Sequence, residues 1–103
     1  MSRYEKRRRV FVRFSAGPTW TSGPPEDQPG WDEHNDFVDD LVERGLFVMG
    51  GPFSDYTGSM TLLEGVTTDQ AKRVVEADPF VQNGVFVLED LREWTIYVDE
   101  VTR

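Results

Sequence analysis

The sequence predicts a single α+β domain with the ferredoxin-like order β-α-β-β-α-β, an antiparallel sheet and one extra strand at the C-terminus. The chain has 103 residues, of which 38% are hydrophobic, so it is long enough for one core and too short for two. Runs of β-branched and aromatic residues alternate with two segments in which apolar residues recur at helical spacing. Two of the strand-like runs are apolar at consecutive positions, which is typical of strands buried on both faces.

The first element expected is a strand over residues 10–15, where β-branched and aromatic residues dominate. Arg13 interrupts this strand and either binds an anionic group of a ligand or forms a surface ion pair. A loop rich in proline and glycine follows over residues 16–30, and loops of this length often bind ligands or cover sites. Trp20 lies in this loop, where it either covers a pocket or anchors the loop by hydrophobic contact.

A first helix is expected from about Trp31 to Arg44. Acidic residues occupy its first turn and Gly45 follows its last, as the helix dipole and C-cap rules require. One face combines apolar residues with a histidine at three- and four-residue steps, and its members are Trp31, His34, Val38, Leu41 and Val42. The opposite face is acidic, so we expect a surface helix with one buried stripe.

The second helix is expected to begin after Thr67, which forms a capping-box pattern with Gln70, and to end near Ala77. Pro79 ends it, because the residue before a proline disfavours the α conformation. That residue is Asp78, which continues the apolar stripe of the helix and therefore places a carboxylate at the end of its core face.

Four further strands are expected, at residues 46–51, 59–64, 85–88 and 94–98. The runs LFVM and VFVL within the first and third of these are apolar at consecutive positions. Two helices packed on one face of a sheet leave the other face open, so something must cover these strands. A second copy of the chain is the simplest cover, and the sequence therefore predicts a dimer formed sheet against sheet.

Acid–base chemistry that uses an imidazole must use His34, because the chain has one histidine. His34 is in phase with the apolar stripe of its helix and therefore points toward the sheet. Both helices cover the same face, so His34 and Asp78 can meet at a shared edge, where the carboxylate would fix the tautomer of the imidazole. The alternatives are a core histidine bonded to a backbone carbonyl and an aspartate that caps a turn.

Consecutive glycines at positions 50 and 51 lie inside an apolar run and allow a close approach to the backbone. Either a ligand or an aromatic ring makes that approach, or the glycines form a bulge or a strand crossing. We expect no metal site, because one histidine leaves only carboxylates as companion ligands. The chain has no cysteine, which excludes disulfides and thiolate catalysis.

The first nine residues form a basic tail ahead of a domain over residues 10–103. The tail carries five basic side chains and one acidic one, so the chain from Val10 onward has a formal charge of −12, against −8 for the whole. Such a domain would repel a phosphate backbone, and we expect no nucleic-acid partner. The tail is interpreted as a solvated terminus, with a nucleic-acid arm or an anionic-surface tether as alternatives. Apolar runs are too short for a membrane span or a signal peptide, so we expect a cytoplasmic protein without a membrane partner.

Several separated motifs resemble those of the YCII-related proteins. In chain order they are Gly17-Pro18, Trp31-x-x-His34, Leu41-x-x-x-Gly45, Gly50-Gly51-Pro52-Phe53, Gly58, Ala77-Asp78-Pro79-Phe80, Gly84-Val85 and Trp94, over about residues 10–98. The resemblance implies a dimeric α/β-barrel fold and a catalytic His-Asp pair that faces a cleft, here His34 and Asp78. It also implies kinship with muconolactone isomerase and dehydrochlorinase-type chemistry on aromatic ring compounds.

We therefore expect a cofactor-free enzyme in which the His-Asp pair carries out general acid–base chemistry on a small cyclic or aromatic compound. The reaction would be of the lyase, dehydrochlorinase or isomerase type. A non-catalytic module that binds small molecules and an accessory dimeric protein are the alternatives. The expected partners are a second copy of the chain and a small-molecule ligand. Residues expected to contact the substrate are Arg13, Trp20, Trp31, Gly50, Gly51, Pro52, Phe53 and Phe80.

Overall fold

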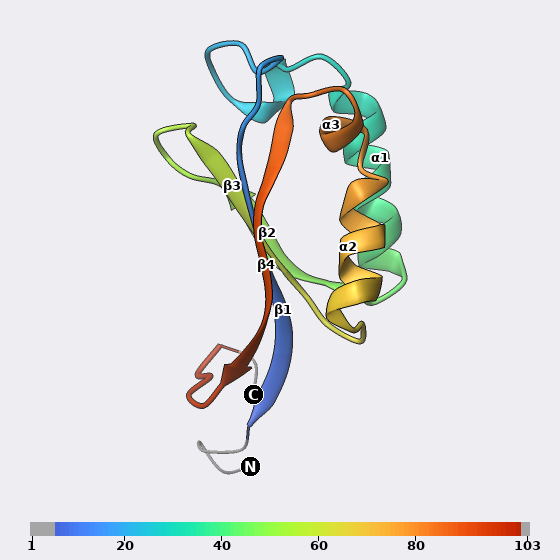
Figure 1. The fold of residues 1–103 in the computed structure, drawn as a ribbon, viewed down its shortest axis with the longest axis vertical. Coiled ribbons are helices and arrows are strands. Elements are labelled where there is room, and N and C mark those ends of the chain that lie inside the picture. Colours follow the sequence, from blue (N-terminus) through green and yellow to red (C-terminus); the bar gives the residue numbers. More distant parts are fainter. Residues whose placement is uncertain (1–5, 102–103) are drawn as a thin grey trace.

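The computed structural model describes residues 6–101 and confirms the α+β class with an antiparallel, ferredoxin-like sheet (Figure 1). The helices and strands in chain order are β1 (Arg7–Ala16), a short 3₁₀ helix η1 (Pro25–Asp27), α1 (Trp31–Glu43), β2 (Phe47–Pro52), β3 (Gly58–Leu63), α2 (Thr68–Glu76), α3 (Pro79–Gln82) and β4 (Phe86–Ile96). The four strands lie in the order β2-β3-β1-β4, and every neighbouring pair is antiparallel. This order places β1 at the centre of the sheet between β3 and β4.

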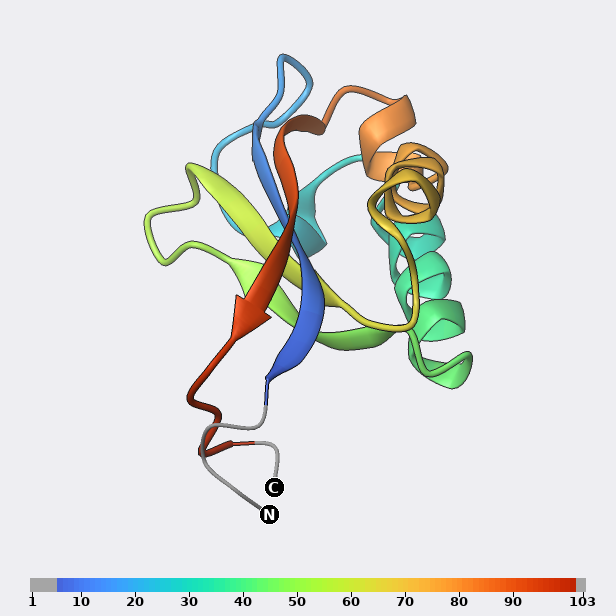
Figure 2. The same ribbon diagram turned by 60° about the horizontal axis from the view of Figure 1, so that its bottom comes forward.

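All three α-helices lie on one face of the sheet, and the other face has no covering layer within residues 6–101 (Figures 1 and 2). Side chains of a strand alternate between the two faces of its sheet, so Val12 and Phe14 of β1 point toward the helices. Arg13 lies between them and points toward the uncovered face. None of the helices in the described chain combines the length and the hydrophobicity needed to cross a lipid bilayer.

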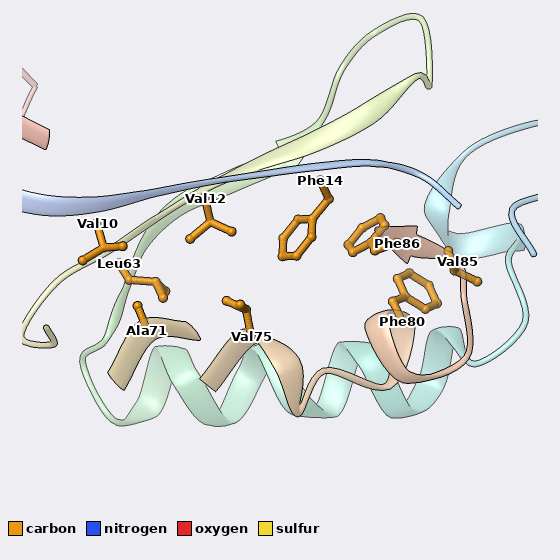
Figure 3. Close-up of a cluster of buried hydrophobic side chains, with 9 residues drawn as sticks. All are labelled: Val10, Val12, Phe14, Leu63, Ala71, Val75, Phe80, Val85 and Phe86. Atoms are coloured by element: carbon orange, nitrogen blue, oxygen red, sulfur yellow. The ribbon is translucent and has the colours of Figure 1, made fainter. Parts of the chain in front are cut away.

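The core lies between β1 and the helices α2 and α3 (Figure 3). It consists of buried apolar side chains from both layers, namely Val10, Val12, Phe14, Leu63, Ala71, Val75, Phe80, Val85 and Phe86. Phe80 and Val12 are fully buried, and the rings of Phe14 and Phe86 stack at 4.8 Å between centroids. This aromatic end of the core lies beside α3, and the buried ring of Phe80 holds this short helix on the sheet.

Both long helices match the sequence prediction to within a residue, and so does the cap of α2. Thr67 accepts a hydrogen bond from the Gln70 backbone N–H, and the Gln70 side chain accepts one from the Thr67 N–H. The buried stripe of α1 was predicted less well, because Val42 is 54% exposed. The helix α3 was not predicted, since a helix of four residues that begins at a proline is too short to show helical periodicity.

The prediction of an extra, separate strand at the C-terminus is wrong. Residues 94–98 and 85–88 were expected to form two strands, but Phe86–Ile96 is one continuous strand that pairs with β1 along its length. The polar segment between the two apolar runs is tolerated because β4 is an edge strand. β1 likewise begins at Arg7, earlier than the strand expected from residue 10, while residues 1–5 of the basic tail lie outside the described residues.

Candidate functional site

His34 is presented by the first turns of α1. The helix begins after Gly30, whose φ of 85° is left-handed, and the His34 N–H donates to the Gly30 carbonyl at 2.9 Å. The imidazole points to the sheet as the periodicity predicted, and 12% of the side chain remains exposed. It is therefore nearly buried but still reachable from one side.

Asp78 lies where α2 has ended and α3 begins. Its backbone is extended, with φ −62° and ψ 127°, as the following proline predicts. The carboxylate caps α3 because Oδ1 accepts the Phe80 backbone N–H at 2.9 Å. Only 5% of the residue is exposed, so the carboxylate has left bulk water and needs such partners.

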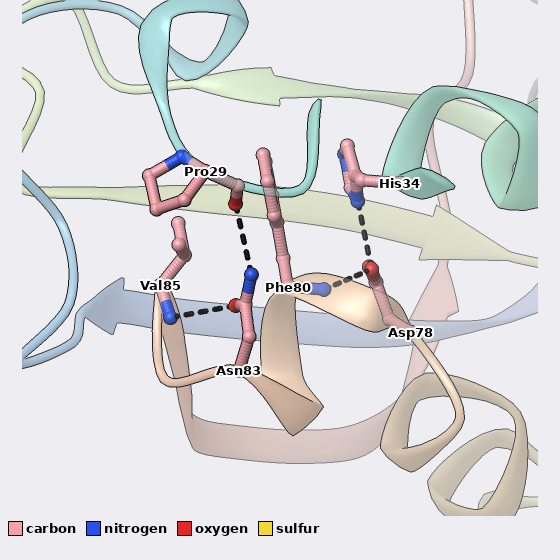
Figure 4. Close-up of polar contacts among 6 residues, drawn as sticks. All are labelled: Pro29, His34, Asp78, Phe80, Asn83 and Val85. Carbon is pink, nitrogen blue, oxygen red and sulfur yellow. Dashed lines mark hydrogen bonds and ion pairs between the residues drawn. The ribbon is translucent and has the colours of Figure 1, made fainter. Parts of the chain in front are cut away.

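The expected contact between the two helical segments is confirmed. Nδ1 of His34 lies 2.8 Å from Oδ1 of Asp78, the same oxygen that caps α3 (Figure 4). A carboxylate accepts, so Nδ1 of the imidazole is the donor, and the neutral ring then carries its lone pair on Nε2. No group in residues 6–101 forms a hydrogen bond with Nε2. The arrangement therefore leaves one ring nitrogen available to a ligand.

Aromatic rings hold the imidazole in place. Phe80 stacks on it at 4.0 Å between centroids and 9° between planes, while Phe86 meets it edge-on at 5.6 Å. A separate tie connects the elements that carry the pair, because the Asn83 side-chain amide donates to the Pro29 carbonyl at 2.8 Å (Figure 4). This bond joins the entry of α1 to the end of α3, and it limits relative movement of His34 and Asp78.

A cavity of about 310 Å³ lies between α1 and the sheet, beside the His-Asp pair. Its lining is largely apolar, with a few polar groups, which is the usual composition of a small-molecule site. The volume is at the lower end of the range for ligand pockets and suits one substituted ring. Sequence-predicted residues that line it, besides the pair, are Trp31, Gly50, Gly51 and Pro52.

Four other residues predicted to contact substrate do not line this cavity. Arg13 points to the opposite face of the sheet. Trp20 packs on Phe86 at 5.6 Å and its Nε1 donates to the Gly23 carbonyl at 3.1 Å, which anchors the loop. Phe53 is half-buried and directly follows the end of β2. Phe80 is fully buried and contacts the imidazole from the core side.

The loop before α1 reaches the cavity through η1, whose Pro25 and Glu26 belong to the lining. Gln28 holds this loop in place, and only 4% of the residue is exposed. The sequence alone did not indicate this role. The side-chain carbonyl oxygen of Gln28 accepts from the Thr21 N–H at 2.7 Å, and its amide donates to the Thr21 carbonyl at 3.0 Å. A buried glutamine thus replaces the regular backbone pairing that this loop lacks.

Several lining residues were missed by the sequence analysis, namely Asn35, Tyr56, Ser59 and Thr61. Ser59 and Thr61 alternate with apolar residues along β3, which is the one signal that could have placed them on the inner face. Tyr56 lies in the hairpin between β2 and β3, and nothing in its local sequence indicates that it lines the cavity.

The two consecutive glycines differ in what surrounds them. A Cβ on Gly50 would lie 2.7 Å from Cζ of Phe47 and 2.9 Å from the Met60 carbonyl oxygen, whereas a Cβ on Gly51 would meet nothing within 4 Å. The close approach at Gly50 is therefore made by an aromatic ring and a neighbouring strand of the protein itself. The register irregularity of β2 lies between Phe47 and Met49, before both glycines.

Gly50→Ala is accordingly expected to lower the free energy of unfolding by about 1–3 kcal/mol, because the methyl group overpacks the strand pair. Gly51→Ala is the matched control, and its unfolding free energy should equal or slightly exceed that of the wild type. Urea unfolding of the two variants measures the difference. Equal effects at both positions would contradict the packing described for Gly50.

The family model described as the YCII-related domain matches residues 11–95. A protein of Bacillus subtilis (strain 168), named Uncharacterized protein YjpA, is 35% identical over 63 residues, which are 61% of this chain and 73% of the relative.

Among solved structures, the chain is similar to the 5-chloro-2-hydroxyhydroquinone dehydrochlorinase TftG from Burkholderia phenoliruptrix AC1100, in complex with 2,5-dihydroxybenzoquinone. The TM-score is 0.56 at 21% sequence identity, and the match covers 82% of this chain and 90% of that one. This likeness extends over most of both chains and agrees with the α+β fold described above.

Proposed function

The chain belongs to the family of YCII-related domains, and on that premise we propose that it is a cofactor-free enzyme that moves protons on a small cyclic compound. His34 is the general base, and Asp78 orients it. The observation that carries the proposal is the 2.8 Å bond between Nδ1 and the buried carboxylate, made beside an apolar cavity of single-ring size. The bond leaves Nε2 as the nitrogen that takes the proton.

The proposed reaction acts on a keto tautomer of the ring and begins when Nε2 of His34 removes a proton from a ring carbon, or from a hydroxyl group, that is conjugated with the carbonyl group. The electron pair released from that bond forms a new double bond. Either a leaving group on the conjugated ring then departs as an anion, or another ring carbon takes up the proton. With chloride as the leaving group the net change is loss of HCl, and the imidazolium returns its proton to water. With reprotonation the net change is isomerisation. Asp78 stabilises the imidazolium in both cases.

The structural neighbour supports the choice of ligand. TftG is a dehydrochlorinase, and its complex holds 2,5-dihydroxybenzoquinone, a flat six-membered ring with oxygen substituents. Such a ring fits the volume and the largely apolar lining of the cavity described above. We therefore propose oxygenated, halogen-bearing rings as the first substrate class to test. We place this activity in the cytoplasm, whose reducing conditions suit a chain without cysteine.

The test has a binding part and a turnover part. 2,5-Dihydroxybenzoquinone is expected to quench tryptophan fluorescence saturably, because Trp31 lines the cavity. Trp31→Phe should remove most of this quenching, while Trp94→Phe, at a residue 46% exposed outside the cavity, should retain it. Chloride release from 5-chloro-2-hydroxyhydroquinone and deuterium exchange into ring positions measure turnover. Saturable binding without either reaction would assign the protein to the non-catalytic binding modules instead.

The proposal includes a homodimer formed through the uncovered sheet face. This face exposes large apolar side chains, namely Met49 (47%), Met60 (37%), Val87 (40%) and Trp94 (46%). Large apolar side chains exposed on one face are typical of an interaction site, and the open side of the sheet has no cover within the described chain (Figure 2). We propose a second copy of the chain as the cover, because its own uncovered face carries the same exposed apolar side chains.

Met49→Glu is expected to convert the dimer into a monomer, because its carboxylate would be buried in an apolar interface. Val42→Glu is the matched control, since Val42 is 54% exposed on α1 and lies away from the sheet. Light scattering should give twice the chain mass of 11.8 kDa for the wild type and for Val42→Glu. A monomeric wild type, or a Met49→Glu variant that stays dimeric, would contradict the proposed interface.

A further inference from the structure

The backbone of Tyr56 is strained. Its φ is 57°, and among residues 6–101 it is the one residue other than glycine with a positive φ. Glycine, asparagine and aspartate adopt this left-handed conformation readily, whereas a bulky aromatic residue does so at a cost. Strain of this kind persists where surrounding contacts impose it, and it concentrates at functional sites.

The hairpin imposes this conformation through its own hydrogen bonds. Asp55 Oδ1 accepts the Thr57 hydroxyl at 2.7 Å and the Thr57 N–H at 3.1 Å, while the Tyr56 N–H donates to the Phe53 carbonyl at 2.8 Å. The Thr57 carbonyl in turn accepts the Ala16 N–H at 3.0 Å, which joins the hairpin to the end of β1. The hydrogen bonds from the Thr57 side chain and backbone lower the pKa of Asp55 below its ordinary value.

Tyr56 belongs to the lining of the same cavity as His34. It is 41% exposed, and its hydroxyl forms no hydrogen bond with any residue of the described chain. The same holds for the hydroxyl of Thr61, which lies on the cavity side of β3. Ser59 differs, because its hydroxyl already donates to the Gly51 carbonyl at 3.0 Å. Two lining residues on the hairpin side of the cavity therefore carry hydroxyl groups without a hydrogen-bond partner in the described chain, and His34 lines the α1 side.

We propose that Tyr56, assisted by Thr61, forms a hydroxyl subsite that binds an oxygen of the ligand remote from the atom deprotonated by His34. The proposal rests on the proposed function and adds to it the residue that determines which substituted rings are accepted. A phenol hydroxyl donates well to a phenolic, keto or carboxylate oxygen. A site built to hydrogen-bond a substituent discriminates against analogues that lack it, because its own polar group is then left unpaired.

The strain and the cavity position have one explanation under this proposal. Asparagine would relieve the backbone at position 56 but would supply neither the ring nor the hydroxyl at the cavity. Loss of ligand preference together with equal or higher stability is therefore the signature expected of Tyr56→Asn, as for other residues that serve function at the expense of stability. A side chain retained for packing alone would show the opposite change in stability.

Hydroquinone and phenol are the probes, because they differ by one hydroxyl group at the far end of the ring. NMR titration of the wild type should show hydroquinone binding about 3- to 10-fold more tightly than phenol, the effect of one additional neutral hydrogen bond. Tyr56→Phe removes only the hydroxyl, and it should bring this ratio close to one. Tyr97→Phe is the matched control at an exposed tyrosine outside the cavity, and it should keep the wild-type ratio.

The possible outcomes separate this inference from the function on which it rests. An unchanged ratio in Tyr56→Phe, with hydroquinone binding weakened by Trp31→Phe, overturns the subsite and leaves the proposed function standing. Failure of the wild type to bind either probe at millimolar concentration overturns both. A melting temperature for Tyr56→Asn well below that of the wild type assigns the side chain to packing and also overturns the subsite. A collapsed ratio in Tyr56→Phe alone, with Tyr56→Asn at least as stable as the wild type, supports it.

Discussion

Replacing His34 with asparagine is expected to lower kcat for chloride release by about 10²- to 10⁴-fold, the range typical of removing a general acid or base. The side-chain amide of asparagine reaches the position of imidazole Nδ1, so it retains a hydrogen bond to Asp78 Oδ1. It places no atom at the position of Nε2. The variant therefore removes the atom that takes the proton while it preserves the partner of the buried carboxylate.

His34→Ala is the comparison that separates chemistry from stability. Alanine leaves an empty space against the ring of Phe80 and removes one donor from Asp78, so the free energy of unfolding should fall by about 2–4 kcal/mol. His34→Asn should lose about 1 kcal/mol, the contribution of the aromatic stacking. We expect the two variants to have equally low kcat and unequal melting temperatures. If kcat instead falls in proportion to the melting temperature in the two variants, His34 acts as a structural core residue and not as the general base.

Asp78→Ala is expected to affect both the fold and the site. The Phe80 N–H loses its cap and His34 Nδ1 loses its acceptor. Water cannot readily replace the lost carboxylate, because only 5% of Asp78 is exposed. The expected loss is about 2–4 kcal/mol of unfolding free energy. For a domain of this size each kcal/mol corresponds to about 4–8 °C in melting temperature, so a thermal melt detects the change easily.

Asp78→Asn is the conservative counterpart. Its amide oxygen can still accept from the Phe80 N–H, and this bond keeps the oxygen turned toward the imidazole. The correct tautomer of His34 is therefore retained, and the variant loses only the negative charge that stabilises the imidazolium. We expect a melting temperature close to that of the wild type and a loss of kcat well below the about 10⁴-fold that a wrong tautomer produces. A loss of that full size would show that the amide has flipped.

Much of the fold and the central pair could be predicted because local signals determine them. The capping box of α2, the apolar spacing of α1 and the proline after Asp78 all act within a few residues. The meeting of His34 and Asp78, 44 residues apart, also followed from local signals. Each residue continues the buried face of its own helix, and both helices cover the same side of the sheet.

The parts that could not be predicted depend on contacts between distant segments. The continuity of β4 across its polar middle depends on pairing with β1, and the left-handed backbone of Tyr56 depends on how the hairpin closes on Ala16. The contribution of η1 to the cavity depends on Gln28, whose buried amide bonds are invisible in a polar loop sequence. Candidate ligand contacts in the hairpin and on β3 were therefore missed, whereas Trp31 and His34 on α1 were found.

A single carboxylate oxygen of Asp78 serves both the Phe80 amide and the imidazole. Opening of α3, a helix of four residues, would therefore disconnect the imidazole from its acceptor at the same moment. Short helices open by local fluctuation well before a domain unfolds as a whole. The Phe80 amide proton thus becomes a natural reporter. Its rate of exchange with solvent gives the fraction of molecules in which the pair is disassembled, without any substrate being present.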